Sequence, residues 1–190
     1  MSDLIGWGGR VDRHDGDAGL RWHQIVTSFD PDFDQGAVFL GLASDDGVRR
    51  NQGRVGAAAG PPTLRRMMSN LPVHSPMFLQ DAGDVVCLAG ELESAQFRYA
   101  QIGSQVLVSG RRLIGLGGGH EIGFASYSAL AQSGVVKPNE RVGILNLDSH
   151  FDLRREPQAT SGTPFLQAME DSSRHWFQLE YRVMGISRAA

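Results

Sequence analysis

The chain has 190 residues, with 18 basic and 21 acidic side chains and a formal net charge of −3. This balance provides no positive field for binding nucleic acid, and no apolar run approaches the ~20 residues of a membrane span. The one cysteine, Cys87, excludes an intrachain disulfide, and the first residues lack the apolar core of a secretory signal. We therefore expect a globular, cytoplasmic protein.

Residues 1–35 are polar and rich in Gly, Asp and Arg, which predicts an irregular lead-in. Beyond it, short apolar runs predict strands at 37–42, 84–88, 112–116, 142–147 and 181–184. Periodic or proline-initiated segments predict helices at 61–70, 91–108, 121–132 and 164–171. Buried strands that alternate with helices are typical of an α/β protein with three αβα layers and a mainly parallel sheet.

Two polar clusters directly follow predicted strands: GGGHE follows 112–116, and DSHFD follows 142–147. In parallel sheets ligands gather at the carboxyl ends of the strands, and one crossover unit would bring the two clusters together. If the chain stays extended after the strand, Asp148, His150 and Asp152 share one side. Two carboxylates and an imidazole favour Mn²⁺, Zn²⁺ or Fe²⁺, although a solvated polar loop would look the same.

The GGGHE segment has two competing interpretations. Its glycines permit a sharp turn that presents His120 at the strand end. It also resembles part of a phosphate-binding glycine loop, which would make the protein a nucleotide-binding α/β domain. The spacing is GxGGGH rather than GxGxxG and the loop follows the third strand, so the metal interpretation is favoured.

Several segments together carry a resemblance to a known family: WGGRVDRHD, RWHQ, SDDGVRRNQGRVGAAAGP, GGGHE, NLDSHFDLR, SGTPF and MGISRAA. They resemble the arginase/agmatinase (ureohydrolase) superfamily, and within it the formimidoylglutamases. The resemblance covers nearly the whole chain. It implies an arginase-like α/β fold and the hydrolysis of linear amidine C–N bonds, in which N-formimidoyl-L-glutamate and water give L-glutamate and formamide.

The resemblance also implies a ligand set for two manganese ions. His120 would bind one ion, His150 the other, and Asp148 and Asp152 would bridge or ligate both. A hydroxide shared by the ions would be the nucleophile near neutral pH, with no further catalytic side chain expected.

Two further positions match residues that orient the amino-acid end of the substrate in relatives, Arg154 and Ser161. A guanidinium can bind a substrate carboxylate through two hydrogen bonds. A surface ion pair between Arg154 and Glu156 is the alternative.

The sequence departs from the superfamily pattern in two important ways. The SGTPF loop lacks the histidine that arginases carry there, which disfavours the hydrolysis of guanidines. The last two metal carboxylates, in an S-x-D-x-D-x-x-D-P motif, do not occur in these 190 residues, so four of six implied ligands are present. The segment SFDPDFD at 28–34 resembles that motif but precedes the first predicted strand, and we interpret it as a surface turn.

We therefore predict one arginase-like domain over 1–190 that is incomplete at its C-terminal side. In the family as usually described, later strands lie between the third and fourth strands found here, so a gap beside the metal site is expected. Another ureohydrolase, acting on agmatine or guanidinobutyrate, and a non-catalytic truncated remnant remain alternatives. A homo-oligomer is compatible with all of these.

Overall fold

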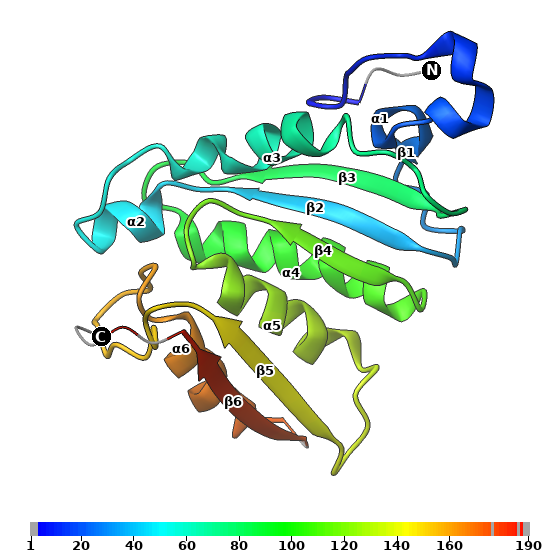
Figure 1. Ribbon diagram of the computed structural model, residues 1–190. Helices are drawn as coiled ribbons and strands as arrows, with labels where there is room; N and C mark the ends of the chain where they lie inside the picture. Colours follow the sequence, from blue (N-terminus) through cyan, green and yellow to red (C-terminus); the bar gives the residue numbers. More distant parts are fainter. Residues whose placement is uncertain (1–3, 176, 186, 188–190) are drawn as a thin grey trace.

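Figure 1 shows the computed structural model, which describes residues 4–175, 177–185 and 187. Its strands are β1 (Val26–Ser28), β2 (Ala37–Ala43), β3 (Leu79–Val86), β4 (Arg112–Leu116), β5 (Arg141–Leu147) and β6 (Gln178–Met184). Its α-helices are α1 (Trp22–Ile25), α2 (Asp46–Arg50), α3 (Gly60–Met68), α4 (Leu92–Val108), α5 (Ile122–Ser133) and α6 (Pro164–Ser172). Two 3₁₀ helices, η1 (Arg13–Gly19) and η2 (Ala57–Ala59), complete the set. In this part of the chain, no helix is both long and apolar enough to cross a bilayer.

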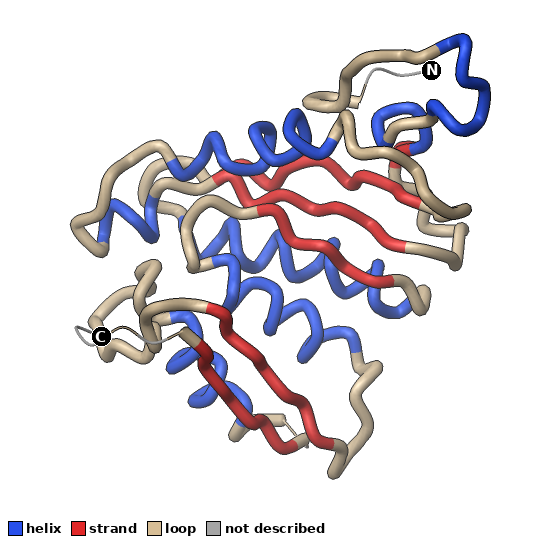
Figure 2. Tube along the Cα trace, in the orientation of Figure 1, coloured by secondary structure: helices blue, strands red, loops and turns tan. Residues whose placement is uncertain are grey.

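The strands form two separate sheets, and every strand pair in them is parallel. Four strands follow the order β1-β3-β2-β4, and β5 pairs with β6 alone. Within the described residues, β4 and β5 share no sheet, and the break between them is visible in Figure 2. This is the position at which the sequence analysis placed a gap.

Helices cover both faces of the larger sheet, with α3 on one face and α4 and α5 on the other (Figure 1). The central strand β2 is buried at each of its seven positions, as its uninterrupted apolar sequence predicted. Leu40 and Leu42 of this strand pack with Val85, Ala95 and Tyr99 in one core cluster. The prediction of an α/β fold with a mainly parallel sheet is confirmed.

The largest difference from the predicted elements is β3, which begins at Leu79 rather than at Asp84. Its first half contains Gln80 and Asp81, which are buried despite their polarity. These polar residues hide the strand from a search for apolar runs. Both have partners outside β3: Arg65 of α3 donates to Asp81, and Arg111 donates to Gln80.

Residues 4–35 are less irregular than expected. They contain η1, α1 and the three-residue strand β1, which extends the sheet by pairing with the start of β3. Trp7 donates from its indole nitrogen to Asp81, 2.6 Å away, so the lead-in is anchored on β3. This region therefore completes one edge of the sheet.

Candidate metal centre

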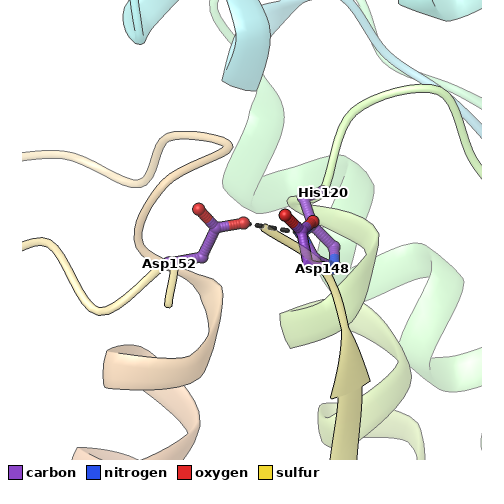
Figure 3. Close-up of side chains that lie close together, drawn as sticks. All are labelled: His120, Asp148 and Asp152. Carbon is purple, nitrogen blue, oxygen red and sulfur yellow. Dashed lines mark hydrogen bonds and ion pairs between the residues drawn. The ribbon is translucent and has the colours of Figure 1, made fainter. Parts of the chain in front are cut away.

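The loops that follow the strands gather at one side of the molecule, on the left of Figure 1. The turn between β4 and α5 carries His120, and the loop after β5 carries Asp148 and Asp152. Figure 3 shows these three side chains pointing toward one another. They come from opposite sides of the break between the two sheets, so the site joins parts of the fold that share no strand pairing.

The three side chains form a compact set of metal-ligand atoms. The Nδ1 atom of His120 lies 2.5 Å from Oδ2 of Asp152 and 3.2 Å from Oδ2 of Asp148. One ligand atom from each residue can be chosen so that all three lie within 4.8 Å of one another. All three residues are partly buried, which limits competition from water without closing the site.

The electrostatics of the site favour a bound cation. The hydrogen bond that the His120 imidazole donates to the Asp152 carboxylate raises the pKa of His120 above its usual value, against the opposing effect of burial. Burial opposes ionisation of Asp148, but the N–H of His150 and the neighbouring imidazoles hold its pKa below the usual value. Two carboxylates thus attract a proton to His120, and a metal ion would replace that proton.

The structure does not continue the extended chain past β5. The strand ends at Leu147, and 148–150 form a bend in which the N–H of His150 donates to Oδ1 of Asp148 at 2.8 Å. The side chain of His150 is 63% exposed and lies outside the three-residue group, with Nδ1 3.3 Å from Asp148. The metal-ligand role of His150 stays a prediction.

Asp152 returns to the site through an unusual backbone conformation, with φ of +48°. Its carbonyl accepts a hydrogen bond from the N–H of Phe165 at the start of α6. The ring of Phe165 meets the ring of His120 edge to face, with centroids 5.1 Å apart. Phe165 thus supports two of the three candidate ligands.

Arg154 and Ser161 lie together in the loop between Asp152 and α6. The N–H of Arg154 donates to the carbonyl of Gly162, so the loop closes on itself. The guanidinium of Arg154 donates to Asn51 at 3.0 Å, instead of forming the ion pair with Glu156 that was the alternative. Asn51 in turn donates to the hydroxyl of Ser161 at 3.1 Å.

Sequence reasoning did not single out Asn51 or Glu121 as site residues. Glu121 follows His120 and is buried, and its carboxylate accepts the N–H of Gly47 at 3.2 Å. Both residues lie inside motifs that carried the family resemblance, but their contacts join segments more than 70 residues apart. The acidic turn at 28–34 is not part of the metal-ligand group found among the described residues.

The fold and the ligand set define a parallel α/β protein with a candidate metal centre at its strand ends. The sequence pattern of the Arginase family matches residues 35–187, and the chain belongs to this family. The final motif of the sequence analysis, MGISRAA, includes residues 186 and 188–190, which lie outside the described residues.

The chain is similar to curated formimidoylglutamases from two bacteria. It is 44% identical to that of Chromobacterium violaceum over 190 residues, which is all of this chain and 60% of the relative. It is 46% identical to that of Ralstonia nicotianae over 193 residues, covering all of this chain and 59% of the relative. The chain thus spans about three-fifths of the length of these relatives.

Solved structures of formiminoglutamases also resemble this chain, which again matches only part of their length. Formimidoylglutamase from Bacillus subtilis matches 96% of this chain and 57% of its own, with a TM-score of 0.74 and 19% identity, which supports the fold alone. Trypanosoma cruzi formiminoglutamase, solved with Mn²⁺, matches 77% of this chain and 55% of its own, with a TM-score of 0.64 and 28% identity.

Proposed function

We propose that this chain carries the larger part of a manganese-dependent formimidoylglutamase. The observation that carries the proposal is the convergence of His120, Asp148 and Asp152 at the strand ends of an arginase-family chain. The relatives at 44% and 46% identity support the choice of substrate. In the reaction, water adds to the formimidoyl carbon, the bond to the glutamate nitrogen breaks, and L-glutamate and formamide leave.

The ligand set fits manganese. Carboxylate oxygens and imidazole nitrogen are the donors that Mn²⁺ accepts, and thiolates, which would favour softer metals, are absent from the group. When bound, the metal supplies positive charge that makes water nucleophilic near neutral pH. In a two-ion site, His120 would hold one ion from the β4 side, His150 would hold the other, and Asp148 and Asp152 would ligate the ions from the β5 side.

Arg154 and Ser161 are proposed to bind the glutamate portion of the substrate. Arg154 is exposed on the loop that begins at the ligand Asp152, and its positive charge complements a carboxylate. The hydroxyl of Ser161 lies on the same loop and shares the partner Asn51 with Arg154. This pairing supports their joint action on one anionic group.

Residues 1–190 are proposed to form part of a single domain that works in the cytoplasm, where the thiol of Cys87 would stay reduced. Homo-oligomer formation is also compatible with this function.

The reaction is tested with the full-length gene product supplied with Mn²⁺. Formamide and L-glutamate should appear from N-formimidoyl-L-glutamate, and chelation by EDTA should abolish their release. Release of urea from agmatine or guanidinobutyrate without formamide would replace the proposal with another ureohydrolase activity. A protein that releases neither product and retains at most one weakly bound metal by elemental analysis would instead be the non-catalytic remnant.

A further inference from the structure

A short segment after β2 contacts both sides of the candidate site. The N–H of Gly47 donates to Glu121, the neighbour of His120, while the carbonyl of Gly47 accepts the N–H of Ser161 at 3.0 Å. Arg50 donates to the carbonyl of Ala159 at 2.9 Å. Residues 47–51 therefore connect the turn that carries the metal ligand His120 with the loop that carries Arg154 and Ser161.

Asn51, at the end of this segment, contacts both proposed substrate-binding side chains. Its amide oxygen accepts from Nη1 of Arg154 at 3.0 Å, and its amide nitrogen donates to Oγ of Ser161 at 3.1 Å. A Cβ atom at Gly162 would lie 3.2 Å from Cδ of Arg154 and 3.5 Å from both amide atoms of Asn51. Because Gly162 has no side chain, the side chains of Asn51, Arg154 and Ser161 have space to contact one another beside it.

The donor and acceptor roles in these two hydrogen bonds determine which donors Arg154 and Ser161 can still offer to a substrate. Because Ser161 accepts from Asn51, its own O–H proton is free to donate elsewhere. Because Asn51 engages only one guanidinium nitrogen and carries no charge, Arg154 keeps its positive charge and its remaining N–H donors. The pair is thereby left with donors for an anionic group.

We propose that Asn51 is a positioning residue that prepares Arg154 and Ser161 to bind a carboxylate of the substrate. This inference rests on the proposed function and adds to it a residue that touches neither metal nor reacting atoms. An aspartate at position 51 would have nearly the same size and shape as the asparagine, but it would carry a negative charge and would only accept hydrogen bonds. Its charge would pair with Arg154, and its oxygen would accept the Ser161 proton that the substrate needs.

The test compares Asn51→Asp with Asn51→Ala in the metal-loaded, full-length gene product. For formamide release, Asn51→Asp should raise KM by about tenfold or more and leave kcat within about twofold, and Asn51→Ala should raise KM less. The melting temperature of Asn51→Asp should match the wild type, because the Asp–Arg pair keeps the loop in place. Asn139→Asp, the same change at an exposed turn, is the control and should leave KM unchanged.

Binding of L-glutamate, measured by titration calorimetry, separates this inference from the proposed function. Wild-type binding that Asn51→Asp loses supports the positioning role even if no formamide is released. An unchanged KM and unchanged L-glutamate affinity in Asn51→Asp would overturn it. So would equal effects of the Asp and Ala variants accompanied by a matching fall in melting temperature, because that result indicates a purely structural contact.

Discussion

Asp152 must satisfy two conditions at once. Its carboxylate faces His120, and its backbone has a positive φ of +48°, a conformation that costs roughly 1–3 kcal/mol for most non-glycine residues. Asp and Asn adopt it more readily than β-branched or bulky residues do. Position 152 is thus restricted by backbone conformation as well as by charge, and the strain marks a place where the loop is held in a defined shape.

Removal of either carboxylate ligand should remove most of the activity. In the full-length gene product, Asp148→Ala or Asp152→Ala should reduce the manganese retained and lower formamide release by more than the roughly 10–100-fold that loss of an outer-shell partner costs, because each carboxylate is expected to ligate metal itself. Kinetics and elemental analysis measure the two effects. Asp34→Ala, in the exposed acidic turn, is the matched control and should change neither; near-normal activity in both ligand variants would refute the site.

Some parts of the candidate site could be predicted from the sequence, and others depend on contacts of single residues that the sequence does not reveal. His120, Asp148 and Asp152 could be predicted together because the loops that follow parallel strands gather on one side of an α/β fold, even though β4 and β5 lie in separate sheets here. The bend at 148–150 could not, since it depends on a local hydrogen bond between the His150 N–H and the Asp148 carboxylate. Asn51 could not either, because its partners lie 103 and 110 residues away along the chain.

At the level of elements, α3 is attached to β3 by a buried ion pair. Arg65 is 2% exposed, binds both carboxylate oxygens of Asp81 and contacts Asp84 at 2.5 Å. The apolar runs of β2, β4 and β5 could be predicted from sequence, whereas the start of β3 is polar, and its buried Asp81 is paired with Arg65 of another element. An element of this kind cannot be identified from its own residues.

Arg65→Met should therefore destabilise the protein strongly. It leaves Asp81 buried without its cation, and loss of one partner of a buried pair typically costs about 3–5 kcal/mol. Chemical denaturation of the full-length gene product measures the free energy of unfolding. Arg66→Met, on the exposed side of the same helix, should change it by less than about 0.5 kcal/mol. A similar, small loss in both variants would show that the pair contributes little.

For the whole molecule, the break between β4 and β5 exposes strand edges and apolar surface. Leu145 and Leu147 of β5 are 59% and 74% exposed, and a hollow of about 360 Å³ lies between α5 and β5, beside His120. Unpaired edges of this kind template association with other chains. The open strand edges and apolar surface that favour self-association therefore lie next to the candidate metal site.

The 190-residue chain should self-associate and bind the dye ANS. Size-exclusion chromatography with light scattering, at micromolar concentration, measures the association. Leu145→Lys and Leu147→Lys together should reduce it, because charges on an open strand disfavour edge pairing. A monomeric chain that melts cooperatively and binds no ANS would contradict this expectation.

His120 follows a strand of one sheet and Asp152 follows a strand of the other, and this arrangement has a thermodynamic consequence. An ion bound between them would act as a cross-link that only the assembled arrangement can offer, so ligand binding and the docking of the two sheets become linked equilibria. Each tenfold rise in free metal above the dissociation constant then adds about 1.4 kcal/mol to the stability of the assembled state. The melting temperature of the protein becomes, in effect, a measure of the metal concentration around it.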